Sequence, residues 1–386
     1  MLVQRIKTLK EIDLKNKRAL VRVNFDVPLD ENGNIEDDFR IRESLPTIKY
    51  LLKNDCRVIL ISHLGRPEGK KVKKYSLKPI AKRLEELLKI KIAFLEEASQ
   101  KAEKMTQTMK PASILMLENL RFDSREEKNS SELAQELSKL GDIFVNEAFS
   151  VCHREHASIV GIPQYLPSVA GFCLEKEINE LNKILFGAKK PLVAIIGGAK
   201  ISTKIKVINK FLRIADRVLI GGALANTIFA KQGFNMANSV IDKDSFADAE
   251  KINLKNPKLF LPIDLGIWDG KKARYADVAN LLKGEKALDI GPKTIHLFAG
   301  AIDGAKTVIW NGPLGLTTQK PFDVGSVEIV QAIAESKSYS VVGGGDTIAF
   351  ISEIKKEKVF NHLSTGGGAM LDYLANETLP GIEVLK

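Results

Sequence analysis

At residues 192–200 the sequence reads LVAIIGGAK, and this stretch is the clearest indication of the architecture. Its apolar part, Val193–Ile196, does not alternate with polar residues, which is typical of a parallel strand buried on both faces. Two glycines follow at once, and the apolar spacing of Ile201, Ile205 and Ile208 then predicts a helix. A buried strand, a glycine turn and a helix in this order predict one step of a doubly wound α/β domain.

The same pattern recurs along the whole chain. Amphipathic helical stretches separate short apolar runs, and this alternation predicts parallel sheets covered by helices on both faces. We expect further strands at Ala19–Val23, Arg57–Ser62, Ile114–Leu117, Ile143–Val145, Arg217–Ile220, Val308–Trp310 and Ser340–Val342.

The length of 386 residues exceeds what one hydrophobic core usually supports, so two domains are expected. Proline and glycine punctuate the middle of the chain, and residues 174–185 then show a helical apolar stripe. We therefore predict two α/β domains with doubly wound parallel sheets, over residues 1–170 and 187–370, joined by one long helix over residues 171–186.

The composition is that of a globular protein, because 44% of the residues are apolar and 27% are charged. No apolar run is long enough for a membrane span, and Met1–Lys10 lacks the apolar segment of a signal peptide. Cys56, Cys152 and Cys173 form no CxxC pair, which argues against disulfides and a zinc site. Cys152 lies beside a His/Arg cluster, but anion binding explains that cluster better than a nucleophilic thiolate does. We expect a cytoplasmic protein.

The chain carries a formal net charge of +10, with 58 Lys and Arg residues against 48 Asp and Glu residues. Such a surplus can indicate nucleic acid, an acidic membrane surface or a small polyanion as the partner. The basic residues are scattered, and the densest run, Lys70–Lys74, is interpreted as a solvated loop without interleaved aromatic residues. We therefore expect no nucleic acid and no membrane among the partners.

Four glycine-rich turns lie in the second half, at Gly197–Lys200, Gly221–Ala223, Gly343–Thr347 and Gly366–Gly368. At least three of them follow a predicted strand and lead toward a helix, where free backbone N–H groups favour phosphate oxygens. One such turn alone is usually only a tight connection, whereas four in one domain indicate a nucleotide site. The chain contains neither a Walker A loop nor a GxGxxG fingerprint.

Two lysines and one aspartate accompany these turns. Lys200 and Lys204 are spaced i,i+4 at the predicted start of a helix, so we expect one helix face with two ammonium groups for a phosphate chain. Asp346 follows three glycines, and its carboxylate suits Mg²⁺ bound together with phosphate oxygens. A helix cap is the alternative interpretation of Asp346.

Cationic side chains mark the first half, at Arg40, His63, Arg66, Arg121 and Arg154. Most of them follow predicted strands, so we expect them to meet at one edge of a sheet. Guanidinium groups bind carboxylate and phosphate in a bidentate manner, so the set suggests a small substrate with at least two negative groups. Any single arginine is more simply a surface ion pair. The polar segment at residues 24–26 either reads hydroxyl groups or makes a turn.

Together these motifs resemble one family, phosphoglycerate kinase, in order and over essentially the whole chain. The similar substrate motifs are RVNFDVP at 22–28, HLGRP at 63–67, ENLRF at 118–122 and HREH at 153–156. The similar nucleotide motifs are GGAK at 197–200, WNGP at 310–313, GGGDT at 343–347 and STGGGA at 364–369. The resemblance implies two Rossmann-like domains and reversible phosphoryl transfer between 1,3-bisphosphoglycerate and ADP, giving 3-phosphoglycerate and ATP in glycolysis or gluconeogenesis.

The resemblance also assigns residues and partners. The residues implied for 3-phosphoglycerate are Asn24, Phe25, Asp26, Arg40, His63, Leu64, Gly65, Arg66, Arg121 and Arg154. Those implied for MgADP or MgATP are Gly198, Lys200, Lys204, Gly221, Gly222, Asn311, Thr318, Gly344, Gly345, Asp346 and Thr347, with Asp346 acting through Mg²⁺. The implied catalytic set is Arg40, Lys200, Lys204 and Gly367. A monomer is expected, with a C-terminal tail, about residues 371–386, that packs back on the first domain.

The chain departs from the family pattern at two places. The family usually has Asp-Phe-Asn where this chain has Asn24-Phe25-Asp26, so a charge moves within the substrate site. Thr318 stands where the family has a glutamate that binds the ribose, so we expect a weaker or altered ribose contact, with help from Gln319.

Two other classes of protein remain as alternatives. An NAD-type dehydrogenase also uses such sheets, but the GxGxxG signature is absent, and NADH binding would decide. A binding protein without activity, derived from the same family, would also explain the basic cluster and the two departures. An assay with 3-phosphoglycerate and MgATP separates that reading from an active kinase.

Overall fold

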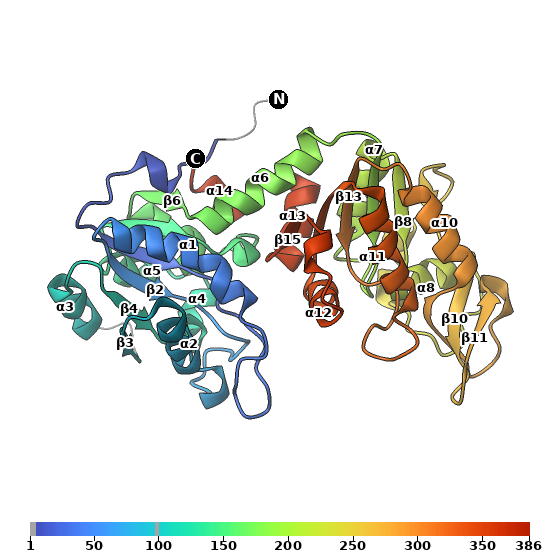
Figure 1. Ribbon diagram of the computed structural model, residues 1–386. Coiled ribbons are helices and arrows are strands. Elements are labelled where there is room, and N and C mark those ends of the chain that lie inside the picture. The colour runs from blue at the N-terminus through green and yellow to red at the C-terminus, as the bar shows by residue number, and fades with distance from the viewer. Residues whose placement is uncertain (1–4, 97–99) are drawn as a thin grey trace. The chain divides into compact units, whose positions relative to one another are not determined.

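The computed structural model describes residues 5–96 and 100–386. The chain forms two compact units. Unit 1 runs to Asn179 and also includes Thr378–Lys386, whereas unit 2 covers Glu180–Glu377. Each unit has its own six-stranded sheet with helices packed against it (Figure 1).

The sheet of unit 1 is parallel throughout, and its strand order is β3-β4-β2-β1-β5-β6. Its strands are β1 Arg18–Arg22, β2 Arg57–Ile61, β3 Ile92–Leu95, β4 Ile114–Leu117, β5 Ile143–Asn146 and β6 Ser168–Ala170. Four of these strands confirm the predicted runs, while β3 and β6 were not anticipated. They are short edge strands, and β3 is only half-buried, so neither has the continuous apolar run of a central strand.

Successive residues of these strands point to opposite faces, and each face has its own core. On one face, Val21 and Leu60 pack with Ile41 and Ile48 of α1. On the other face, Leu20 packs in the core that contains residues of α3 and α5. The helices of unit 1 are α1 Phe39–Lys53, α2 Lys78–Leu88, α3 Gln100–Thr108, α4 Ser124–Glu127, α5 Ser131–Ser138 and α14 Pro380–Glu383. The doubly wound prediction is confirmed.

The C-terminal segment Thr378–Lys386 belongs to unit 1. The N–H of Gly381 donates to the carbonyl oxygen of Cys152 at 2.9 Å, and the N–H of Lys7 donates to that of Leu385 at 3.1 Å. Residues 371–376 of the expected tail lie instead in helix α13 of unit 2, because that helix extends over Gly367–Asn376.

Helix α6, Phe172–Phe186, contains the division between the units. Its first turn is held by buried groups of unit 1. The N–H of Phe172 donates to Thr47 Oγ1 at 2.8 Å, and the N–H of Cys173 donates to the carboxyl group of Glu147 at 3.1 Å. Burial raises the pKa of Glu147 to about 8.

The main sheet of unit 2 is also parallel, with the order β15-β14-β13-β7-β8-β9. Its strands are β7 Leu192–Ile196, β8 Arg217–Ile220, β9 Leu259–Phe260, β13 Thr307–Asn311, β14 Tyr339–Gly343 and β15 His362–Ser364. Its helices are α7 Ile205–Ile214, α8 Gly222–Lys231, α9 Phe246–Ala249, α10 Pro292–Ile302, α11 Val324–Ser336, α12 Gly345–Glu353 and α13 Gly367–Asn376. The four strands predicted in this half are confirmed.

Strands β9 and β15 were not anticipated, and both are short edge strands of the main sheet. The sequence also did not reveal a three-stranded antiparallel sheet in unit 2, in the order β11-β10-β12. Its strands are β10 Asp264–Trp268, β11 Ala273–Asp277 and β12 Lys286–Ile290. Along β11 burial alternates between exposed and half-buried residues, so this strand has no buried run for a search of apolar stretches to find. No helix among the described residues is long and apolar enough to cross a membrane.

Candidate active site in two units

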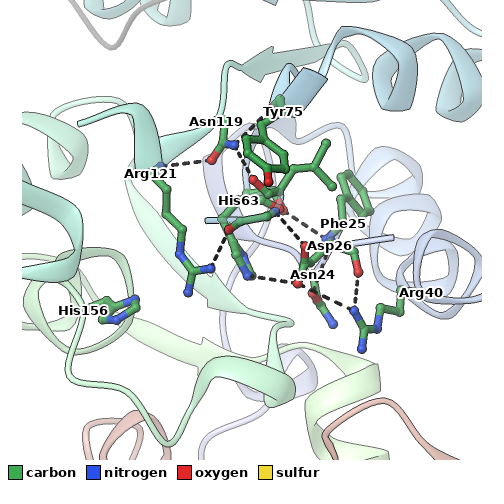
Figure 2. A network of polar contacts seen from close by, with 12 residues as sticks. Asn24, Phe25, Asp26, Arg40, His63, Tyr75, Asn119, Arg121 and His156 are labelled. Atoms are coloured by element: carbon green, nitrogen blue, oxygen red, sulfur yellow. Dashed lines mark hydrogen bonds and ion pairs between the residues drawn. The ribbon is translucent and has the colours of Figure 1, made fainter. Parts of the chain in front are cut away.

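The polar residues predicted for a substrate in unit 1 lie where its central strands end. Asn24–Asp26 follow β1, His63–Arg66 follow β2, and Arg121 lies in a short 3₁₀ helix after β4. Because these strands are parallel neighbours, their carboxyl ends lie at the same sheet edge. Figure 2 shows Asp26, Arg40 and His63 turned toward one another, with Arg121 on the other side of His63.

Asp26 is the centre of this cluster. Its Oδ1 accepts a hydrogen bond from the N–H of Gly65 at 2.8 Å. Its Oδ2 lies 3.9 Å from Arg40 Nη1 and 3.7 Å from His63 Nε2, and the same Arg40 nitrogen donates to the backbone carbonyl of Asp26. The carboxylate thus orients two cationic or donor groups and the turn between them (Figure 2).

Arg121 is fixed by the neighbouring backbone. Its Nη1 donates to the carbonyl oxygen of Gly65 at 2.8 Å, and its own N–H donates to Asn119 Oδ1 at 3.0 Å. Asn119 Nδ2 in turn donates to the carbonyl of Leu64 at 2.7 Å and to that of Tyr75 at 2.9 Å. Burial lowers the pKa of Arg121, although the charge of a guanidinium remains.

The remaining predicted residues of this site differ in exposure. Phe25 and Leu64 are buried in the core, so they offer backbone groups, not side chains, to a ligand. Asn24 is 5% exposed, and its Nδ2 has no hydrogen-bond partner among the residues that the structure describes. Arg66 and Arg154 are exposed. Among the described residues, this site therefore combines exposed cations with a buried amide donor, an arrangement suited to an oxyanion.

A layer of buried polar residues lies beneath this cluster, and the sequence did not predict it. Arg22 at the end of β1 is fully buried, and its Nε donates to Ser158 Oγ at 2.8 Å. Ser158 Oγ donates to Glu126 Oε1 at 2.6 Å, and Glu126 is also fully buried. The one signal in the sequence is an arginine that ends an otherwise apolar strand, but its partners come from distant segments.

The glycine turns of unit 2 provide close approaches of backbone. Gly198, after β7, has φ +85°, and its N–H donates to the carbonyl of Pro313 at 2.8 Å. Gly222 has φ +68° at the start of α8, and a Cβ there would lie 2.8 Å from the backbone nitrogen of Gly198. An L side chain is strained at this φ in both positions, and at Gly222 it would also collide with backbone atoms. Gly221 precedes this helix as its N-cap.

Lys204 is the buried cation of unit 2. It is 7% exposed, donates to the carbonyl of Gly197 and lies 3.4 Å from the carbonyl oxygen of Asn311. Burial lowers its pKa to about 8, and the nearby charge of Asp346 opposes this shift. The expected helix face with Lys200 and Lys204 is wrong, because α7 begins at Ile205 with Lys204 as its N-cap. Lys200 is exposed before the helix, since turns occupy residues 201–204.

An apolar pocket of about 260 Å³ lies beside these turns. Its wall includes Gly198, Gly222, Asn226, Leu265, Leu288, Asp289, Ile290, Leu314, Leu316 and Asp346. Burial raises the pKa of Asp289 to about 7. Thr318 is exposed and is not among the residues that line the pocket. The pocket suits a flat, largely apolar group such as a nucleobase, with the glycine turns and Lys204 next to it.

The N-termini of two helices, α12 and α13, complete the candidate site of unit 2. Gly344 has φ +103°, and α12 begins after it with Asp346 exposed in its first turn. Thr347 Oγ1 accepts from the N–H of Gly312 at 3.0 Å, which links this turn to the segment after β13. The first helical residue of α13 is Gly367. The first N–H groups of a helix have no partner within the helix, so such a helix start can bind an anion.

These residues fit Mg²⁺ only as a companion of phosphate groups. Within residues 5–96 and 100–386, no three His, Cys, Asp or Glu residues form a group that could hold a metal ion. Asp346 offers one carboxylate, and Mg²⁺ in nucleotide sites is typically held by one or two carboxylates together with phosphate oxygens and water.

The chain is similar to known proteins over nearly its whole length. The family model described as phosphoglycerate kinase matches residues 9–377. A phosphoglycerate kinase from Chloroflexus aggregans is 45% identical over 397 residues, covering 98% of each chain. One from Thermosipho africanus is 44% identical, covering 97% of this chain and 96% of the relative. The solved phosphoglycerate kinase from Coxiella burnetii has a TM-score of 0.85 at 35% identity, with 99% of each chain covered, and that from Pyrococcus horikoshii has a TM-score of 0.87 at 31% identity, with 98% covered.

Cationic side chains on one parallel-sheet unit and glycine-rich helix starts on another are features that suit a small-molecule kinase. The chain is a phosphotransferase. It belongs to the phosphoglycerate kinase family, whose members catalyse the reversible phosphoryl transfer between 1,3-bisphosphoglycerate and ADP in glycolysis.

Proposed function

We propose that the family reaction proceeds here with 3-phosphoglycerate bound in unit 1 and MgADP or MgATP bound in unit 2. The observation that carries this proposal is the cluster around Asp26, in which Arg40, His63 and Arg121 surround one turn at a sheet edge. Three such groups match a substrate that carries both a carboxylate and a phosphate.

In this proposal each group of unit 1 has a defined task. Arg121, Arg66 and Arg154 neutralise the phosphate of 3-phosphoglycerate, while Arg40 and His63 bind its reacting carboxylate. The unpaired Nδ2 of Asn24 donates to a hydroxyl or carboxylate oxygen of the substrate. Backbone groups of Phe25, Leu64 and Gly65 form the wall of the proposed 3-phosphoglycerate site.

The nucleotide residues of unit 2 divide in the same way. The pocket beside Gly221 and Gly222 takes the adenine, and Thr318 lies at the ribose position with one hydroxyl. Lys200, Lys204 and Asn311, together with the backbone of Gly198 and of Gly344–Thr347, hold the phosphate chain. Asp346 binds the Mg²⁺ that accompanies the phosphates.

The chemistry requires no covalent intermediate. A carboxylate oxygen of 3-phosphoglycerate attacks the γ-phosphorus of ATP in line, and ADP leaves; the reverse reaction uses the acyl phosphate. A carboxylate is already deprotonated, so no general base is needed, and catalysis consists of positioning and charge neutralisation. We assign the neutralisation to Arg40, Lys200, Lys204 and the helix start at Gly367.

The two ligands must touch during transfer, so both units have to approach each other in the reacting state. We expect α6 to serve as the hinge, because it contains the division between the units. We further propose a monomeric enzyme. We also propose a reducing compartment such as the cytoplasm, since Cys56, Cys152 and Cys173 are all buried and none of them forms a disulfide within the described residues.

A coupled assay tests the proposal. The full chain with 3-phosphoglycerate and MgATP should release ADP, and omission of 3-phosphoglycerate or of Mg²⁺ should abolish the release. A chain that binds both ligands in calorimetry but shows no turnover would be a binding protein of the same family, and the proposal would then be wrong.

A further inference from the structure

The imidazole of His63 is buried and is held from behind by an arginine. His63 is 2% exposed, and its Nδ1 lies 3.1 Å from Nη2 of the fully buried Arg22. The guanidinium of Arg22 cannot turn away, because its Nε donates to Ser158 Oγ at 2.8 Å and its Nη1 donates to the carbonyl of Val23 at 2.7 Å.

A guanidinium has donors only, so the chemistry of this contact fixes the proton of His63. Nδ1 must be the acceptor and therefore carries no hydrogen. A neutral imidazole has one N–H, which is then on Nε2. In a protonated His63, the N–H at Nδ1 would point at the N–H of Arg22 Nη2, and two donors would face each other at this contact.

We infer that Arg22 is a positioning residue that keeps His63 neutral, with its hydrogen on Nε2, so that an uncharged N–H donor faces the bound oxyanion. The inference rests on the proposed function in one respect, namely that the substrate lies on the Nε2 side of the ring. It assigns to Arg22 a task that its burial alone does not explain.

The direction of Nε2 supports the inference. Nε2 lies 3.7 Å from Asp26 Oδ2, which is too long for a good hydrogen bond. The N–H at Nε2 of His63 therefore points toward Asp26 and Arg40 but makes no good hydrogen bond with Asp26. An oxyanion bound beside these two residues can accept a hydrogen bond from this N–H (Figure 2).

The charges that face His63 come from several elements. Burial, followed by the positive charges of Arg22 on β1, Arg121 and Arg40 on α1, lowers the pKa of His63 well below its usual range. The neighbouring imidazole of His156 shifts that pKa in the same direction, although the pKa of His156 is itself lowered to about 3. Asp26 is the carboxylate nearest to Nε2 and opposes this shift. The neutral state that the hydrogen-bond geometry requires is thus also the state that this environment favours.

Arg22 has its own counter-charge, which keeps the guanidinium in place. Glu126 accepts from Ser158 Oγ at 2.6 Å and from the N–H of Ser158 at 3.0 Å, so the serine hydroxyl links the carboxylate to the guanidinium. Loss of this carboxylate alone would leave a buried cation without its counter-charge, so the test of Arg22 replaces both residues. A single Glu126→Gln variant is compared with it only after thermal unfolding has shown that the variant folds.

Nitrogen NMR of the histidine rings in the substrate-free full chain reads the tautomer directly. His63 should show an unprotonated Nδ1 and a protonated Nε2, without titrating between about pH 5 and 8. A protonated Nδ1, or a ring that titrates in this range, would overturn the inference. This readout needs no substrate, so it can fail or succeed independently of the proposed function.

Paired variants test the role of Arg22. Arg22→Met with Glu126→Gln removes both buried charges, and Glu126→Gln alone is the control that keeps the contact between Arg22 and His63. The double variant should lose the fixed tautomer, and its KM for 3-phosphoglycerate should rise on the order of tenfold, as expected for the loss of one hydrogen bond to a charged group. The control should keep the NMR signature. A double variant with an unchanged tautomer would overturn the inference.

A substitution at His63 itself remains informative if the buried pair cannot be replaced. The side-chain amide of His63→Gln can place a donor near the position of Nε2, whereas that of His63→Asn reaches only the position of Nδ1. His63→Gln should keep the KM within about threefold, and His63→Asn should raise it about tenfold. Equal losses in both variants would show that an Nε2 donor is not what the substrate uses.

Discussion

The carboxylate of Asp26 accepts the backbone N–H of Gly65 at 2.8 Å, and this bond ties the segment after β1 to the turn after β2. The family usually has an asparagine at this place, whose amide oxygen can accept the same bond. The carboxylate therefore adds no further bond to the turn, although a charged acceptor makes the existing bond stronger. It does add a negative charge 3.9 Å from Arg40, in a site proposed for an anion.

Asp26→Asn should lower the KM for 3-phosphoglycerate about three- to tenfold with little change in kcat, because unit charges a few ångströms apart repel by a few kcal/mol near a protein surface before salt screening. Steady-state kinetics at low and high salt would measure this, and the gain should shrink with salt. Asp55→Asn, at an exposed position beyond the far end of α1, is the control. A higher KM in Asp26→Asn would mean that the carboxylate itself binds the substrate.

Arg40→Ala should reduce kcat on the order of 10²–10³-fold and leave the Kd for MgADP nearly unchanged, since Arg40 is assigned to charge that develops during transfer. Turnover and calorimetry of the same preparation would separate the two effects. Arg42→Ala is a matched control, because Arg42 lies two residues further on the same helix and pairs with Asp38 at 2.6 Å. Unchanged turnover in Arg40→Ala would remove this residue from the mechanism.

The parallel strands could be predicted because a strand that is buried on both faces has apolar residues at successive positions, and such a continuous apolar run is visible in the sequence. Leu20 and Val21 show why: they are adjacent in β1 and lie in different cores. The strand β11 leaves no such signal, because neither of its faces is fully buried.

The side chains of the site were predictable in type but not in their contacts. Lys204 was assigned to a helix face by its spacing, yet a turn precedes α7 and buries the amine among backbone carbonyls. Arg22 has its polar partners at Ser158 and His63, which lie 136 and 41 residues away, so no local pattern reveals them. Spacing along the chain cannot encode such long-range pairs.

Thr318→Glu should tighten ADP binding about five- to tenfold, since a carboxylate can accept hydrogen bonds from both ribose hydroxyls and such charge-assisted bonds are stronger than neutral ones. Titration calorimetry would measure the change. Thr317→Glu adds the same charge one residue earlier and is the control. If the two variants bind ADP equally, another residue already holds the ribose.

Lys204→Met should change how stability depends on pH. The pKa of Lys204 is lowered to about 8 in the folded chain, below that of an unfolded lysine, so the unfolded state binds more protons between these two values. Stability of the wild type should therefore rise with pH there, and relative to Lys204→Met it should gain about 2–3 kcal/mol from about pH 7 to 10. Urea unfolding followed across this range measures the difference, with the exposed Lys206→Met as the control that should show none. A constant difference between the wild type and Lys204→Met would mean that folding does not lower the pKa of Lys204.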